Sequence, residues 1–274
     1  MAEGKGSTRP SEGKKSMPLE HSPAPRPSGS ARIIHLSAEY WPYIRTGGLA
    51  EAVRGMASFQ SLAGSETTVL LPLFGKIRDG DYGLKPVGKA FKVKIGPRVE
   101  TGRLWQATKK NAGVRVLLVE HDGYFGRPGV YGEGGQDCLD NHLRFSFLAA
   151  AAVKLMPMLA PGPDPVLLHM HDWHTALAAV YLRTQANEDP FSDRVATVLT
   201  VHNGGFQGHF PPEVLADMGL PLDLYTMEFM EWYGRANILK GGLVFTDMAT
   251  TVSPSHSFEL RTEDGGFGLH HTFL

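Results

Sequence analysis

The sequence predicts an α/β fold with a doubly wound, mostly parallel, Rossmann-like sheet. Three observations lead to this prediction. Short apolar segments rich in β-branched residues alternate with Ala-rich helical segments along the chain. Polar loops follow several of the predicted strands. Hydrophobic residues make up 42% of the 274 residues, so the chain can bury a substantial core.

The first half of the chain contains two strand predictions with a helix between them. "ARIIHLSAE" (31–39) and "TTVLLPLF" (67–74) read as strands, and residues 49–62 form an Ala-rich helical stretch. Residues 85–120 differ, because "KPVGKAFKVKI", "RVETGRLWQATKK" and "VRVLLVEH" suggest antiparallel strands. We expect these strands to be inserted or to lie at the sheet edge.

The second half continues the alternation after a long loop with many glycines. A helix is predicted over "NHLRFSFLAAAAVKLM", with Asp140 as its N-cap. Three buried strands are predicted at 164–172, 194–203 and 247–254. Helical segments lie between them, at about 175–185 and 235–245. This β-α alternation favours the parallel sheet.

Composition narrows the classes of partner and compartment. The formal net charge of -1 gives no electrostatic reason to expect nucleic acid or an anionic membrane. A single cysteine, Cys138, rules out a disulfide within the chain and suits a reducing cytoplasm. Bacterial cytoplasm and plastid both stay open.

The chain shows no segment that predicts membrane insertion or secretion. The nearest apolar run, residues 147–160, is short and contains Lys154 and Pro157. The N-terminus has no apolar core of the signal-peptide kind. Residues 1–30 are rich in Ser, Pro, Gly and Lys, a composition that predicts a disordered tail. We therefore predict one folded domain over residues 31–274.

Polar side chains gather in the loops that follow predicted strands. Five such loops contain Glu39 with a glycine pair, "HDGYFGRPGVYG", "HDWH", "HNGGFQGHF" and "SPS". In open α/β sheets, ligands bind in the crevice outside the carboxyl ends of the strands. The common placement of these loops predicts a ligand site at that edge.

The segment "RTGGLAE" (45–51) contains the pair Gly47 and Gly48 before the first predicted helix. Paired glycines let the backbone approach a ligand, and the following helix offers free N–H groups to an anion. The segment is neither a dinucleotide fingerprint nor a P-loop. A ligand loop and a plain strand-to-helix turn fit it equally well.

Two further motifs carry candidate side chains. "HMHDWHTAL" (169–177) invites a metal-site interpretation, but no matching Cys or Glu cluster is evident, so we predict no metal. Asp172 fits either a helix cap or a carboxylate presented to a polyhydroxylated substrate. In "TVHNGGFQGHF", His202 and Asn203 fit either hydrogen bonding to a sugar or an ordinary loop in which Asn adopts a positive φ.

The motifs together are more specific than any one of them. They include "SAEYWPYIRTGGLAEAV", "YFGRPGVYG", "DNHLRFSFL", "HMHDWHTALAAVYL", "TVHNGGFQGHFP", "NILKGGLVFTDMATTVSPS" and "GGFGL". In this order they resemble bacterial glycogen synthases and plant starch synthases, over about residues 31–269. The resemblance implies the GT-B architecture, in which the active site lies between two Rossmann-like domains. It also implies transfer of glucose from ADP-glucose to the non-reducing end of an α-1,4-glucan, with no metal ion or other cofactor.

The resemblance also assigns residues. It places Asp172 and His202 at catalytic positions. It implies substrate binding at Glu39, Arg45, Gly47, Gly48, Tyr131 and Asn203. Arg45 stands where the family usually has lysine, and this change keeps the charge but alters the geometry. "ILKGGL" also departs from the family pattern, and we attribute that change to packing.

The main departure is that the chain ends five residues after "GFGL", where the family continues into a donor-binding domain. The resemblance therefore covers the N-terminal, acceptor-side half, and we expect the chain alone to be inactive. Alternatives are a glucan-binding or regulatory half-synthase that pairs with a separate donor domain or a full-length synthase, and a truncated gene product. Another retaining GT-B transferase fits the motifs less well.

Overall fold

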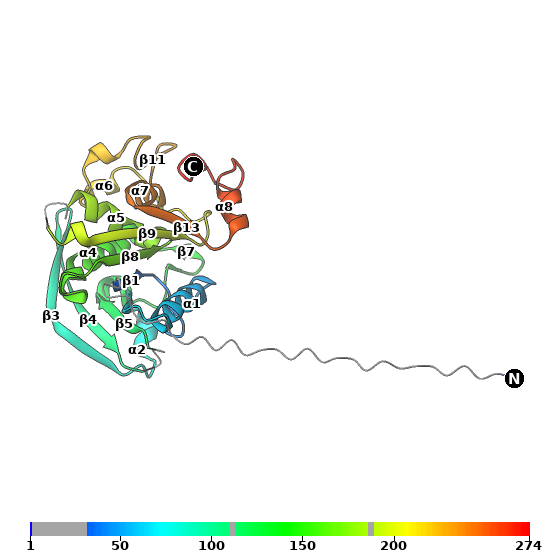
Figure 1. Ribbon diagram of the computed structural model, residues 1–274. Helices are drawn as coiled ribbons and strands as arrows, with labels where there is room; N and C mark the ends of the chain where they lie inside the picture. Colours follow the sequence, from blue (N-terminus) through cyan, green and yellow to red (C-terminus); the bar gives the residue numbers. More distant parts are fainter. Residues whose placement is uncertain (2–31, 110–112, 186–188) are drawn as a thin grey trace.

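An eight-stranded mixed sheet organises the chain (Figure 1). The computed structural model describes Met1 and residues 32–109, 113–185 and 189–274, so the tail predicted over residues 1–30 lies outside the described residues apart from Met1. The strand order is β13-β9-β8-β1-β2-β5-β4-β3. These strands are β1 (Arg32–Leu36), β2 (Thr67–Pro72), β3 (Leu84–Ile95), β4 (Arg98–Ala107), β5 (Arg115–Glu120), β8 (Val166–His171), β9 (Val195–Val201) and β13 (Met248–Thr251).

The strand order reverses at β1. Strand β1 pairs in parallel with β2 on one side and with β8 on the other. From β1 the chain passes to β2, then to the outermost strand β3, and comes back through β4 to β5 beside β2. It then crosses β1 to form β8 on the other side and continues outward to β9 and β13. This reversal is the topological switch point of a doubly wound sheet, and it confirms the predicted fold class.

Helices cover both faces of the sheet. The longer ones are α1 (Leu49–Leu62), α4 (Asn141–Leu159), α5 (Trp173–Thr184) and α7 (Ile238–Phe245). Helix α1 contacts β2, whereas α5 packs against both α4 and α7. Right-handed crossovers that run in opposite directions from a switch point place their helices on opposite faces. Helix α1 thus covers one face and the group of α4, α5 and α7 covers the other.

Short elements fill the connections. Two small sheets pair β10 (His209–Phe210) with β12 (Arg235–Asn237) and β11 (Glu231–Trp232), and β6 (Gly132–Glu133) with β7 (Gln136–Asp137). Short helical turns are α2 (Gly75–Arg78), α3 (Asp122–Phe125), η1 (Ser192–Arg194), α6 (Val214–Asp217), η2 (Leu222–Leu224) and α8 (Pro254–Leu260).

The segment predicted as antiparallel strands is confirmed in part. Strands β3 and β4 form a long antiparallel hairpin at the sheet edge. Strand β5 differs, because it pairs in parallel with β2 and antiparallel with β4. Its burial explains the difference. The four residues Val116–Val119 are fully buried, as in a central strand, whereas most of β3 is exposed or half-buried.

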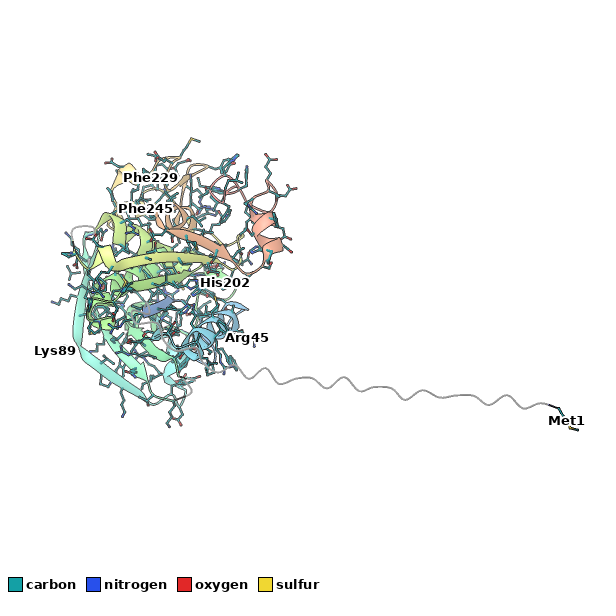
Figure 2. The ribbon with its side chains drawn as sticks, in the orientation of Figure 1. Met1, Arg45, Lys89, His202, Phe229 and Phe245 are labelled. Carbon is teal, nitrogen blue, oxygen red and sulfur yellow. The ribbon has the colours of Figure 1, made fainter. Side chains whose placement is uncertain are left out.

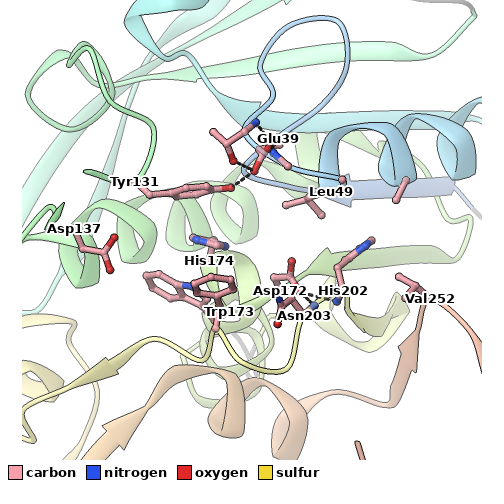
Figure 3. A pocket seen from close by; sticks show the side chains of 15 residues that line it. Glu39, Leu49, Tyr131, Asp137, Asp172, Trp173, His174, His202, Asn203 and Val252 are labelled. Atoms are coloured by element: carbon pink, nitrogen blue, oxygen red, sulfur yellow. Dashed lines mark hydrogen bonds between the residues drawn. The ribbon is translucent and has the colours of Figure 1, made fainter. Parts of the chain in front are cut away.

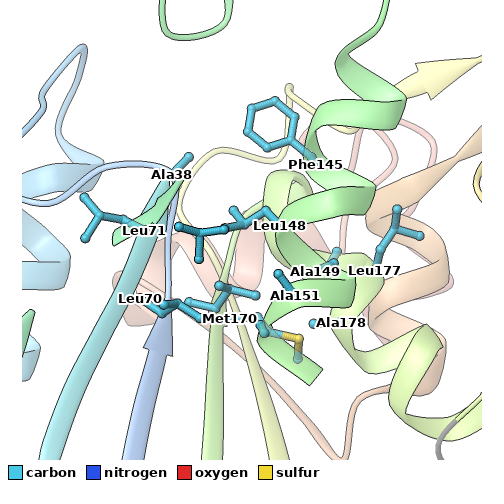
Figure 4. Close-up of a cluster of buried hydrophobic side chains, with 14 of the residues drawn as sticks. Ala38, Leu70, Leu71, Phe145, Leu148, Ala149, Ala151, Met170, Leu177 and Ala178 are labelled. Atoms are coloured by element: carbon cyan, nitrogen blue, oxygen red, sulfur yellow. The ribbon is translucent and has the colours of Figure 1, made fainter. Parts of the chain in front are cut away.

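The hydrophobic core lies between the sheet and the α4-α5 layer. Figure 4 shows Leu148, Ala149 and Ala151 of α4 between the strands on one side and Leu177 and Ala178 of α5 on the other. All five are at most 2% exposed. The small alanine side chains allow α4 to approach both of its neighbours closely, which keeps the packing dense.

Helix α4 meets the length and apolarity of a membrane span, contrary to the expectation from the sequence that no segment does so. Its 19 residues are mostly buried within the protein, as in a core helix. Asp140 occupies its N-cap position as predicted, but its side chain accepts no capping hydrogen bond. The carboxylate instead binds Arg127 through two bonds of 2.7 and 2.6 Å, which outcompete the cap.

Candidate functional site

The polar loops meet in one pocket of about 590 Å³ at the switch point (Figure 3). Loops that follow β1, β5, β8, β9 and β13 all contribute to it. Its lining is Glu39, Thr46, Gly47, Gly48, Leu49, Ala52, Tyr131, Asp137, Asp172, Trp173, His174, His202, Asn203, Phe206 and Val252. The predicted ligand edge is therefore a single concave surface.

Glu39 organises the loop that contains the glycine pair. Its carboxylate accepts hydrogen bonds from Thr46 N (2.5 Å), Thr46 Oγ1 (2.5 Å) and Gly47 N (3.2 Å). It also accepts a bond of 2.6 Å from the hydroxyl of Tyr131, which comes from a different loop. The side chain is only 2% exposed. Glu39 thus ties two walls of the pocket together, and this bonding draws on its lone pairs rather than leaving them to a ligand.

The fold itself places little demand on the glycine pair. A Cβ added at Gly47 or Gly48 would meet no atom within 4 Å, and neither residue has a positive φ. A plain turn therefore does not require glycine at these two positions. Both face the pocket, where the absence of a side chain leaves the backbone open to a ligand.

Arg45 lies beside this loop but is not among the residues that line the pocket. Its guanidinium pairs with Glu51 of α1 at 2.8 Å, and its side chain is 55% exposed. Figure 2 shows Arg45 and His202 toward the same side of the molecule. To reach a ligand in the pocket, the Arg45 side chain has to leave Glu51.

Asp172 is a strongly perturbed carboxyl group of the pocket. Its Oδ1 accepts bonds from His202 N (2.7 Å) and Asn203 N (3.5 Å). The side chain makes no capping bond to α5, so of the two alternatives left open for Asp172 the helix cap is wrong. Burial raises its pKa to about 7, helped by the nearby charge of Glu39 and opposed by the two backbone amides. Its backbone adopts φ 57° and ψ -179°, a region that costs a non-glycine residue about 1–3 kcal/mol. Strain and a perturbed pKa of this kind cluster at functional sites.

His202 and Asn203 follow β9 and complete the same wall. Asn203 Oδ1 accepts a bond of 2.9 Å from Gly205 N and so closes a local turn. Among the described residues, the non-glycine positive φ values belong to Asp172, Tyr233 and Phe267, so the alternative in which Asn203 adopts a positive φ is wrong. Burial lowers the pKa of His202 to about 4, which keeps its imidazole neutral at pH 7.

The structure adds residues that the motifs alone did not single out. Thr46, Asp137, Phe206 and Val252 also line the pocket. Thr46 and Phe206 lie inside "RTGGLAE" and "HNGGFQGHF", so their proximity to the site is readable from the sequence. Val252 directly precedes "SPS", so its proximity is readable in the same way. Asp137 reaches the pocket only through the folded path of its loop, which no local pattern reveals.

The histidines of "HMHDWH" separate onto two faces. His174 faces the pocket and stacks on Tyr131, with ring centroids 4.4 Å apart. His169 and His171 lie in β8 beside His35 of β1, buried and outside the pocket lining. One ring nitrogen from each of these last three residues lies within 4.8 Å of the other two, close enough to be drawn together around a metal ion. However, His35 Nδ1 and His171 Nε2 already hydrogen-bond to each other at 2.9 Å.

The side chains noted in "GYFGRPGVYG" mostly support the loop. Arg127 pairs with Asp140, and the hydroxyl of Tyr124 donates to Glu100 at 2.9 Å. Cys138 is a half-buried free thiol outside the pocket. Of this loop, Tyr131 reaches the pocket together with Asp137.

Comparison with known proteins places this chain in a family. The chain is 39% identical over 237 residues to a glycogen synthase of Syntrophotalea carbinolica, and 38% identical over 239 residues to one of Anaeromyxobacter sp. strain K. These matches cover 86% and 87% of this chain and 48% of each relative. The chain thus spans about half the length of the relatives it matches.

A solved structure agrees with this match. The catalytic domain of starch synthase IV from Arabidopsis thaliana, bound to ADP and acarbose, superposes with a TM-score of 0.75 at 28% identity. The superposition covers 89% of this chain and 49% of that one. It confirms the expected GT-B type of domain. Residues 32–274 match the family model described as the starch synthase catalytic domain, and the chain belongs to this family of glycosyltransferases.

Proposed function

We propose that this chain provides one wall of an active site that transfers glucose from ADP-glucose to the non-reducing end of an α-1,4-glucan. One observation carries the proposal: Glu39, Tyr131, Asp172, His202 and Asn203 converge on one pocket at the switch point. The related starch synthase IV is described with ADP, the nucleotide part of ADP-glucose, which supports this choice of donor.

In this proposal Asp172 and His202 are the catalytic residues of the pocket. His202 and Asn203 offer hydrogen-bonding groups to the transferred sugar. Asp172 holds the backbone of both and places a carboxyl group beside the transferred sugar, where charge develops during transfer. Gly47 and Gly48 admit the donor close to the backbone. Arg45 binds the donor diphosphate after it releases Glu51.

The pocket is open, and transfer requires exclusion of water from the reacting groups. A second, donor-binding domain supplies that enclosure in our proposal, either as part of a longer chain, as a separate protein or from a full-length synthase. We expect the 274-residue chain alone to show negligible turnover. We place the reaction in the cytoplasm, with a plastid as the alternative, and assign it no metal ion, no nucleic acid and no membrane partner.

A chimera tests the proposal. Residues 32–274 are joined to the part of the Syntrophotalea carbinolica glycogen synthase that follows the matched region, and transfer of labelled glucose from ADP-glucose to glycogen is measured. We expect turnover by the chimera and none by the chain alone. A folded chimera without activity, or an isolated chain with robust activity, would contradict the proposal. Co-sedimentation of the isolated chain with glycogen, together with an inactive chimera, would favour a glucan-binding module instead.

A further inference from the structure

A glutamine, two buried histidines and a half-buried histidine form a hydrogen-bonded line that ends in the pocket wall. Gln60 Oε1 lies 2.6 Å from His35 Nε2, and His35 Nδ1 lies 2.9 Å from His171 Nε2. His171 Nδ1 in turn lies 3.1 Å from His202 Nε2. The line begins on α1, crosses β1 and β8, and ends in the loop after β9. We call these four residues the imidazole line.

The line has a fixed direction. A neutral imidazole carries one donor and one acceptor nitrogen. Because the carbonyl oxygen of Gln60 can only accept, His35 Nε2 must carry the proton, and its Nδ1 then accepts. By the same logic His171 carries a proton on Nε2 and donates it in a hydrogen bond to Nδ1 of His35. His202 must likewise donate from Nε2 to His171.

The histidines of the line are neutral at pH 7, as this logic requires. Burial lowers the pKa of His35 and of His202 to about 4 and holds the pKa of His171 well below its usual range. None of them is then able to donate from both ring nitrogens. His202 Nδ1 therefore carries a lone pair. No partner for this atom is found within residues 32–109, 113–185 and 189–274, and His202 itself lines the pocket.

We infer that Gln60, His35 and His171 are positioning residues that fix His202 as the Nε2–H tautomer, so that its Nδ1 accepts a hydrogen bond from a sugar hydroxyl in the pocket. This inference rests on the proposed function. The backbone of His202 is held separately, by its bond to Asp172 Oδ1 at 2.7 Å. Backbone and ring are thus both fixed before a ligand arrives, which reduces the entropy lost on binding.

A metal ion bound by the buried histidines would give His202 the opposite tautomer. The neighbouring ring nitrogens of His35, His169 and His171 could be drawn to one ion. If His171 Nε2 bound the ion, its proton would have to sit on Nδ1. His171 would then donate to His202 Nε2, and His202 would carry its proton on Nδ1. The tautomer of His202 distinguishes the two arrangements.

The ring nitrogens can be read directly in the full chain. The 12 histidines are labelled with ¹⁵N, and one- and two-bond ¹⁵N–¹H couplings report which nitrogen of each ring carries a proton. The His202 signals are assigned by their loss in His202→Asn. We expect Nε2–H at His202 in the natural chain. Gln60→Met removes the acceptor that sets the direction, and we expect it to give a mixture of both tautomers at His202. Phe59→Gln, on the exposed neighbouring position of α1, should change nothing.

Several results would overturn the inference. They are Nδ1–H at His202 in the natural chain, a His202 tautomer that Gln60→Met does not change, and stoichiometric bound metal with Nδ1–H. In the chimera, Gln60→Met should lower kcat/KM about fivefold or more relative to Phe59→Gln, and equal values would refute the positioning role. An inactive natural chimera would count against the proposed function, whereas the tautomer decides the imidazole line without any turnover.

Discussion

At the scale of single residues, Asp172 combines burial, backbone strain and two hydrogen bonds to the backbone of the next strand loop. Burial opposes its ionisation, while the amides of His202 and Asn203 favour it. A carboxyl group whose pKa lies near 7 is able to exist in either protonation state under physiological conditions. Such a group suits a catalytic position better than a structural one.

Asp172→Asn should raise the stability of the chain and lower the activity of the chimera. The pKa of Asp172 is about 7 in the folded chain, against an ordinary value of 3.8 for an aspartate carboxyl group. As the pH rises from about 4 to 7, the unfolded chain loses this proton before the folded chain does, so the free energy of unfolding falls. The loss is complete above pH 7. Asparagine stays neutral, so we expect the variant to be more stable at pH 8 by about 2–4 kcal/mol, and turnover of the chimera to fall about 100-fold or more.

Urea unfolding at pH 4 and pH 8 measures the stability effect. The gain should be present at pH 8 and small at pH 4. Asp137→Asn provides the control, because Asp137 also lines the pocket but is exposed. A variant that loses stability equally at both pH values would show that the charge of Asp172 carries no penalty in the folded chain.

The sequence predicted the functional role of a residue only where that residue lies inside a recognisable motif. Asp172 and His202 lie in loops after strands, and their pattern points to a site. Gln60 and His35 lie inside a helix and a strand that read as ordinary core-forming segments. Their meeting with His171 depends on the pairing of β1 with β8 and on the packing of α1 over that face. No single segment contains this information.

At the scale of elements, hydrophobic pattern predicted the type and position of most segments, with two exceptions. The helix predicted at about 235–245 begins with the short strand β12, and β13, predicted as a buried strand, is mostly exposed. The helix predicted over residues 49–62 has the observed bounds of α1, and the strands β1, β2, β8, β9 and β13 lie within their predicted ranges. The position of strand β5 was harder to predict, because a run of buried residues does not indicate which strands it pairs with. Its parallel pairing with β2 is set by the whole sheet rather than by its own sequence.

Two glycines in helices should respond in opposite ways to alanine. A Cβ at Gly242 of α7 would lie 2.4 Å from the Cβ of Ala176 in α5, so Gly242→Ala must push the helices apart. We expect a loss of about 1–3 kcal/mol. A Cβ at Gly55 of α1 would meet nothing within 4 Å. Gly55→Ala should therefore stabilise the chain by about 0.5–1 kcal/mol through helix propensity.

Thermal and urea unfolding of both variants test this pair. Gly55→Ala serves as the matched control, since it adds the same methyl group to a helix without a close neighbour. If Gly242→Ala unfolded like the natural chain, the close approach of α5 and α7 would not limit the packing of this face.

At the scale of the whole molecule, the order of the strands makes the site. Only the reversal at β1 brings the loops after β1 and β8 to opposite sides of one pocket. The sequence predicted that these loops lie at the same edge of the sheet. Which loops are neighbours along that edge depends on the order of the strands, which the sequence did not predict. The same reversal buries a group of histidines in the interior, and this has a consequence for the stability of the entire chain.

Acid should unfold the molecule cooperatively. Four histidines are at most 8% exposed and have pKa values lowered mainly by burial: His35, His169, His171 and His174. The unfolded chain binds protons on them near pH 6.5, whereas the folded chain does so only at about pH 4 or below. Stability is therefore complete above pH 6.5 and falls as the pH decreases. Each histidine contributes up to about 1.4 kcal/mol per pH unit, and the four together contribute up to about 5.6 kcal/mol per pH unit.

Asp172 acts in the opposite direction with a single proton, so it weakens this slope without reversing it. A domain with about 5–15 kcal/mol of stability should then unfold between about pH 4 and 5.5. Tryptophan fluorescence and far-UV circular dichroism, followed from pH 8 to pH 3, should show one coincident transition, because all elements share one sheet and core. His271→Gln should leave the midpoint unchanged, since His271 is exposed. A chain that keeps its native spectra at pH 3.5 would show that these histidines take up protons without unfolding it.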